Sequence, residues 1–223
     1  MTGVQTCALP ISPLLAFRYG PSVAVAAVAL PHAIATALRF WRLRAAVDRG
    51  LLLRFGLLSA IGGLAGALWY ARLGSRTVFL VLAVLLIMTA VAGLTGWAER
   101  VRARGAVAWL LGLASGFFGG VVGNQGGLRA AALMSFGLAP AAFVATSTAI
   151  ALCVDAVRAP VYLVRAGAEL TPLAWPIAVA SAGTVFGTLI GERILFGLGP
   201  RRFRAIVSSI IGILGVWLLV RPG

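Results

Sequence analysis

The chain contains no lysine, one histidine and only two cysteines. Without lysine it has neither the P-loop lysine of nucleotide-binding motifs nor a lysine for Schiff-base chemistry. His32 alone cannot form an HExxH motif or a histidine metal cluster. Cys7 and Cys153 give no basis for a disulfide framework. The sequence therefore predicts no enzyme activity, no catalytic residue, no metal site and no cofactor.

Charged residues are also scarce, at 11% of 223, whereas 61% of residues are hydrophobic and the mean hydropathy is +1.03. Soluble domains have about 25% charged and about 45–50% apolar residues. One soluble core cannot cover so much apolar surface, so a lipid bilayer is the expected surrounding. All 19 Lys and Arg residues are arginines, and most of them lie in short gaps between apolar runs. This distribution is typical of loop anchors in membrane proteins, and we expect no nucleic-acid partner.

Seven stretches are long and apolar enough to be predicted as membrane spans, since a transmembrane helix needs roughly 20 mostly apolar residues. They are Ser22–Phe40, Leu51–Ala71, Val78–Trp97, Val107–Val122, Ala141–Val164, Leu173–Phe196 and Phe203–Val220. A further apolar piece, Leu128–Phe136, is too short to cross a membrane. The predicted fold is an all-α, polytopic transmembrane helix bundle with about seven spans and a short broken helix.

Two patterns recur along the chain at matching spacings. Pro21 and Arg39 match Pro140 and Arg158, while Gly62, Gly66 and Arg72 match Gly183, Gly187 and Arg193. Internal repeats are common in secondary transporters. We predict two related repeats of about four helices: residues 12–100 with three helices, and residues 101–223 with four helices, the GNQGG loop and a half-helix. Glycines four apart also predict close helix packing, at Gly62 and Gly66, Gly112 and Gly116, and Gly183 and Gly187.

The first residues are set aside from the fold prediction. GVQTCALPI resembles the translation of a common sequencing-library adapter, so residues 1–11 are expected to be an artefact. The first repeat is then truncated at its N-terminus. We expect one more helix and a second glycine loop before Pro13 in the complete protein.

A polar, glycine-rich segment interrupts the apolar sequence after the fourth span, in GNQGGLRAAAL at residues 123–133. Non-helical backbone at membrane depth must lie inside protein or line a polar cavity. The following short helix would direct its free N–H groups into the loop, where helix N-termini attract anions. The candidate substrate-binding residues here are Gly123, Asn124, Gln125, Gly126, Gly127 and Arg129. The alternative is a tight interfacial turn from which Arg129 reaches the lipid headgroups.

The fifth span contains hydroxyl and charged side chains. Thr146 and Ser147 are candidate substrate ligands, although such hydroxyls, together with Thr148, also bond to the preceding helical turn. Asp155 and Arg158 lie three residues apart on one helix face, and charges inside a span are usually paired. The sequence leaves open whether this intramembrane ion pair is a structural clip or part of a proton relay.

The segment GFFGGVVGNQGGLRAAALMSFGLAPAAFVATSTAIALCVDAVRAPVYL resembles the second repeat of the sulfite exporter TauE/SafE family, in the branch with a GNQG loop. The resemblance implies a multi-pass protein of the cytoplasmic membrane that transports a small organic or sulfur-containing anion, such as sulfite or a sulfonate. It also implies that the loop residues face the substrate path. The other interpretations are a membrane scaffold or partner subunit without transport, and an intramembrane enzyme. The sequence leaves open whether the protein forms a homo-oligomer.

Overall fold

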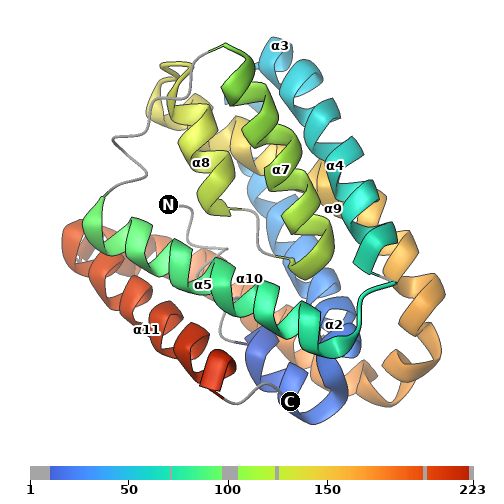
Figure 1. Cartoon of the computed structure of the whole chain (residues 1–223). Coiled ribbons are helices and arrows are strands. Elements are labelled where there is room, and N and C mark those ends of the chain that lie inside the picture. The colour runs from blue at the N-terminus through green and yellow to red at the C-terminus, as the bar shows by residue number, and fades with distance from the viewer. Residues whose placement is uncertain (1–10, 71, 97–104, 124–125, 198–199, 221–223) are drawn as a thin grey trace. The chain divides into compact units, whose positions relative to one another are not determined.

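The computed structural model describes residues 11–70, 72–96, 105–123, 126–197 and 200–220 (Figure 1). These residues form helices joined by short turns, with no strand among them, which confirms the all-α prediction. The helices are α2 (Ile11–Leu43), η1 (Arg44–Ala46), α3 (Arg49–Leu51), η2 (Leu52–Gly56), α4 (Leu57–Tyr70), α5 (Ser75–Thr95), α7 (Ala106–Val122), α8 (Gly126–Met134), α9 (Pro140–Leu170), η3 (Thr171–Leu173), α10 (Ala174–Gly197) and α11 (Pro200–Val220).

Four helical stretches of the described chain are long and apolar enough to cross a membrane. They are Val23–Ala46, Arg49–Tyr70, Arg76–Thr95 and Pro140–Leu189, whereas α7 and the apolar part of α11, Ala205–Val220, are shorter. The last stretch runs through α9, η3 and α10, where the sequence predicted two spans with a gap between them. Residues 165–170 of that gap are RAGAEL, mostly good helix formers, so α9 continues to Leu170. The number of seven spans stays a prediction.

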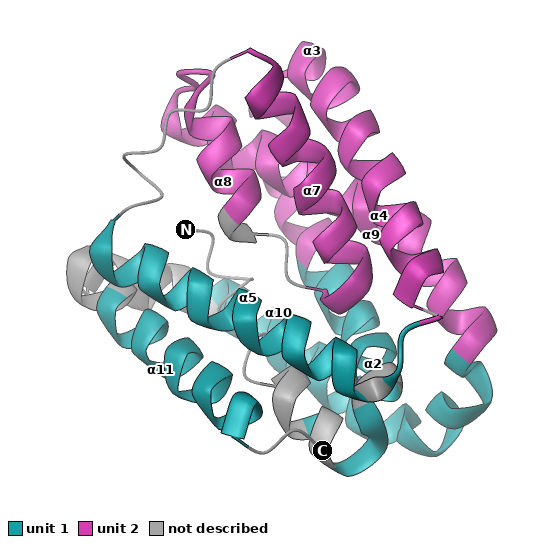
Figure 2. Ribbon diagram, viewed as in Figure 1, with its two compact units in different colours: residues 1–35, 73–97, 166–223 teal, residues 36–72, 98–165 magenta. Residues whose placement is uncertain are grey.

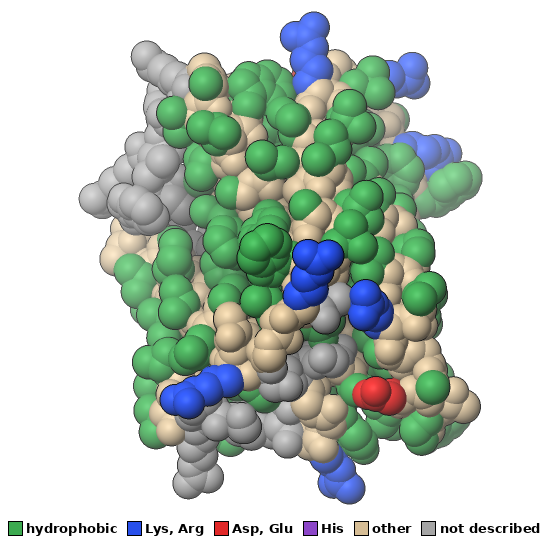
Figure 3. Space-filling view, turned by 45° about the vertical axis from the view of Figure 1, so that its right-hand side comes forward, with side chains coloured by type: hydrophobic (Ala, Val, Ile, Leu, Met, Phe, Trp, Pro, Cys, Tyr) green, Lys and Arg blue, Asp and Glu red, His purple; other side chains and the backbone are tan. Residues whose placement is uncertain are grey.

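Large apolar side chains are exposed along these helices, as expected of a surface in contact with lipid. Leu53, Val164 and Trp175 are each more than 70% exposed. Hydrophobic side chains also predominate on the face shown in Figure 3. Large exposed apolar areas mark membrane or protein contact, and here they lie along helices long and apolar enough to cross a membrane.

The chain forms two compact units (Figure 2). Unit 1 contains residues 1–35, 73–97 and 166–223, and unit 2 contains residues 36–72 and 98–165. Each unit therefore combines segments from both predicted repeats. The compact units do not follow the repeat boundaries, which stay a prediction from the sequence.

In unit 1, α5 packs along α11. Contact is close at two glycines of α11: a Cβ at Gly215 would lie 2.9 Å from the side chain of Ile87, and one at Gly212 would lie 3.1 Å from Ala90. In α10, by contrast, a Cβ at Gly183 would meet no described atom within 4 Å. The close packing predicted for Gly183 is therefore not seen in the described part of unit 1.

In unit 2, α4 packs along α7 through glycines on both helices. A Cβ at Gly62 would lie 2.2 Å from the carbonyl oxygen of Leu113, and one at Gly116 only 1.9 Å from that of Ser59. The Ser59 hydroxyl donates to the carbonyl of Gly112 across the same contact at 2.9 Å. These distances confirm the close approach predicted from the glycine spacing. The contact fixes α7, and with it the start of the polar loop.

Candidate functional site

The predicted interruption after the fourth span is a break between two helices of unit 2. Helix α7 ends at Val122, and Gly123 adopts a left-handed φ of 76° that glycine tolerates without strain. Its N–H donates to the carbonyl of Gly119 at 3.0 Å. Helix α8 begins at Gly126. Asn124 and Gln125 lie outside the described residues, as do the surroundings of Gly126 and Gly127.

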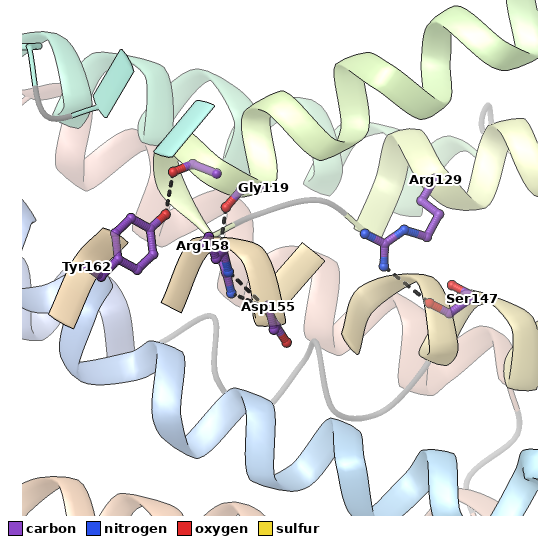
Figure 4. Close-up of polar contacts among 7 residues, drawn as sticks. Gly119, Arg129, Ser147, Asp155, Arg158 and Tyr162 are labelled. Atoms are coloured by element: carbon purple, nitrogen blue, oxygen red, sulfur yellow. Dashed lines mark hydrogen bonds and ion pairs between the residues drawn. The ribbon is translucent and has the colours of Figure 1, made fainter. Parts of the chain in front are cut away.

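Arg129 lies in the first turn of α8 and is buried, with 1% of its surface exposed. Its Nη1 donates to the backbone carbonyl of Ser147 in α9 at 3.3 Å (Figure 4). The guanidinium therefore points into the protein, toward the helix that carries the predicted hydroxyls. This geometry does not fit the alternative in which Arg129 reaches out to lipid headgroups.

The three hydroxyl residues of α9 have different surroundings. The hydroxyl of Thr148 donates to the carbonyl of Val144 one turn earlier, at 2.7 Å. Thr146, which is fully buried, instead accepts a hydrogen bond from the backbone N–H of Asp48 at 2.9 Å. Ser147 contacts Arg129 through its carbonyl rather than its hydroxyl. The structure thus brings Arg129 and Ser147 together and joins Thr146 to the segment before α3.

The ion pair predicted in the fifth span is present in α9. Asp155 Oδ1 lies 2.8 Å from Arg158 Nε and 2.6 Å from its Nη2, and both side chains are 3% exposed. Arg158 Nη1 also donates to the carbonyl of Gly119 at 2.6 Å. A buried ion pair needs such further hydrogen bonds to offset its desolvation. Arg158 therefore connects Asp155 to the last turn of α7.

Tyr162 is a further residue at the break that the sequence analysis did not single out. Its hydroxyl donates to the carbonyl of Gly120 (Figure 4). Its ring packs edge-on against Tyr70, with 5.6 Å between centroids. Tyr162 follows Arg158 by four residues, so both lie on one face of α9. That spacing was the signal available in the sequence.

These contacts give two carbonyls at the end of α7 partners inside the protein. The last four carbonyls of a helix lack partners within it, and lipid offers none. Here the carbonyls of Gly119 and Gly120 receive donors from Arg158 and Tyr162. The N-terminus of α8 follows, with the buried guanidinium of Arg129 in its first turn. Such an arrangement can attract an anion through N–H donors and a positive charge.

A cavity of about 410 Å³ in unit 1 has a different character. Its lining comes from α2, η3 and α10 and includes Pro31 and Trp175. Thr184 is a hydroxyl residue of the lining, and its hydroxyl faces the carbonyl of Pro31 at 3.4 Å and that of Ser181 at 2.9 Å. Among the described residues, no charged side chain lines this cavity. The described lining therefore lacks the groups that would hold a small anion.

A comparison with protein families matches residues 6–218 to the family described as sulfite exporter TauE/SafE. The match covers nearly the whole chain, and the family is one of membrane transporters. It begins inside the segment set aside as an artefact, so that exclusion stays a prediction. Comparisons with curated proteins and with solved structures found no match.

Proposed function

The chain belongs to the sulfite exporter TauE/SafE family, and from this premise we propose that it is a secondary transporter of a small anion. The substrate class is an organic or sulfur-containing anion, such as sulfite or a sulfonate, carried across the cytoplasmic membrane. The observation that carries this proposal is the burial of Arg129 beside a helix break. A buried cation is costly to insert into a membrane protein, which supports a functional role for Arg129.

The proposed site uses the start of α8. The N–H groups of its first turn have no helical acceptors, and the helix dipole favours negative charge there. Arg129 adds a planar set of donors that suits carboxylate, sulfite and sulfonate oxygens. Asn124, Gln125, Thr146 and Ser147 are proposed as further hydrogen-bonding partners of the anion.

Transport is proposed to proceed by alternating access driven by an ion gradient, since the chain has no lysine for a nucleotide-binding motif. Asp155 is proposed as a structural clip rather than a proton carrier. This role is supported by its two contacts with Arg158, which in turn binds the carbonyl of Gly119.

The experiment is anion flux in proteoliposomes that contain the purified chain. Sulfite, methanesulfonate, sulfoacetate and acetate are compared in vesicles with and without protein. We expect protein-dependent flux of at least one sulfur-containing anion and its loss in Arg129→Gln. The matched control is Arg165→Gln, which removes an exposed arginine of α9 and should leave flux unchanged.

Two results would contradict the proposal. Absence of flux for every anion in folded wild-type protein would favour a scaffold or partner subunit. Equal flux in wild type and Arg129→Gln would remove the proposed site while leaving the family assignment in place.

A further inference from the structure

The C-terminal end of α7 is covered by side chains of α9. Arg158 Nη1 donates to the carbonyl of Gly119, and the Tyr162 hydroxyl donates to the carbonyl of the next residue, Gly120 (Figure 4). Both residues are buried. A Cβ at Gly123 would lie 3.4 Å from Arg158 Nη1, so the guanidinium also lies against the turn that ends the helix.

This end of the helix is unfavourable for an anion. The carbonyls of a helix C-terminus carry about half a negative charge, whereas a helix N-terminus carries a similar positive charge. Helix α8 begins at Gly126, four residues after Val122, so the two ends lie within about 14 Å of each other. An anion at α8 is therefore close to the negative end of α7. Carbonyls exposed at a break are also ligands for Na⁺ or K⁺.

We propose that Arg158 and Tyr162 determine charge selectivity, by occupying the carbonyls of Gly119 and Gly120 so that the break accepts an anion rather than a cation. This inference rests on the proposed function. Asp155 pairs with Arg158, so the two together add no net charge at α7. The positive charge that attracts the substrate then comes from Arg129 and the start of α8.

Tyr162 permits a selective test because its ring and its hydroxyl have separate contacts. The ring packs against Tyr70, and the hydroxyl binds the carbonyl of Gly120. Tyr162→Phe keeps the ring and uncovers the carbonyl. Tyr19→Phe is the matched control, because it makes the same change on a ring that is 41% exposed.

The experiment measures competition by methanesulfonate and by sulfate against flux of the transported anion. These two tetrahedral anions carry one and two negative charges. An electrostatic role predicts that Tyr162→Phe weakens competition by sulfate about tenfold and competition by methanesulfonate about threefold, because repulsion grows with the charge of the anion. Arg158→Lys keeps the charge opposite Asp155 but loses the planar donors, and it should show the same order. Thermal melting in detergent confirms that each variant is folded.

The outcomes separate the two proposals. If competition by the two anions weakens equally, or does not weaken, the selectivity role is overturned and the anion site stands. Failure of wild type to transport or bind any anion would overturn the proposed function, and the selectivity role with it. We expect competition by sulfate to weaken more than competition by methanesulfonate in both variants, and Tyr19→Phe to behave like wild type.

Discussion

Replacing Gly116 with alanine perturbs the closest helix contact in unit 2. The new Cβ would lie 1.9 Å from the carbonyl oxygen of Ser59, on a backbone that cannot turn aside. Ordinary contacts begin at 3.4 Å. Helices α4 and α7 must therefore separate by about 1.5 Å, because packed interiors have no space to absorb the methyl group.

The expected effect combines two opposing contributions. Alanine favours a helix over glycine by about 1 kcal/mol. Overpacking costs about 1–3 kcal/mol, and the separation also weakens the dispersion contacts and the hydrogen bond from Ser59 to Gly112. We expect a net loss of about 2 kcal/mol in the free energy of unfolding, which corresponds to a melting temperature lower by about 4–8 °C.

The assay is thermal melting of the purified protein in detergent, followed by intrinsic tryptophan fluorescence. Gly167→Ala in α9 is the control, because its Cβ would meet no described atom within 4 Å. That variant should be unchanged or slightly more stable. A melting temperature for Gly116→Ala equal to or above that of wild type would refute the glycine-mediated contact between α4 and α7.

Two further predictions concern α9. Asp155→Asn leaves the guanidinium of Arg158 buried without its counter-charge, which should cost about 3–5 kcal/mol of folding stability. The variant should then lose its monodisperse peak in detergent chromatography. A normal peak and melting temperature would show that Arg158 does not need the carboxylate. Thr146→Val removes the acceptor for the N–H of Asp48 and should cost about 1 kcal/mol, seen as faster hydrogen exchange at that amide. Unchanged exchange would exclude this bond.

Hydropathy was sufficient to predict most helices, since each predicted span lies largely within one. The break between α7 and α8 was also predictable, because glycines and amides interrupt an apolar run there. The length of α9 was not, because good helix formers between Arg165 and Leu170 extend it beyond the apolar stretch. Hydropathy reports which residues tolerate lipid, and helix propensity reports which residues continue a helix.

The site was predictable in its composition more than in its contacts. The spacing of Asp155 and Arg158 predicted their pairing, which the structure confirms. The spacing of Arg158 and Tyr162 put them on one face of α9, but their contacts with the carbonyls of α7 depend on how α9 packs against that helix. Likewise, glycine spacing could not distinguish the tight contact at Gly62 from the open surroundings of Gly183.

The central claim is that Arg129 holds the transported anion at the start of α8. Equilibrium binding of a radiolabelled sulfonate to purified wild-type and Arg129→Gln protein tests it most directly. A charge-assisted hydrogen bond contributes about 1.5–3 kcal/mol, so the variant should bind about 10- to 100-fold more weakly while it still melts cooperatively. Saturable binding of equal affinity in the two proteins would contradict the account.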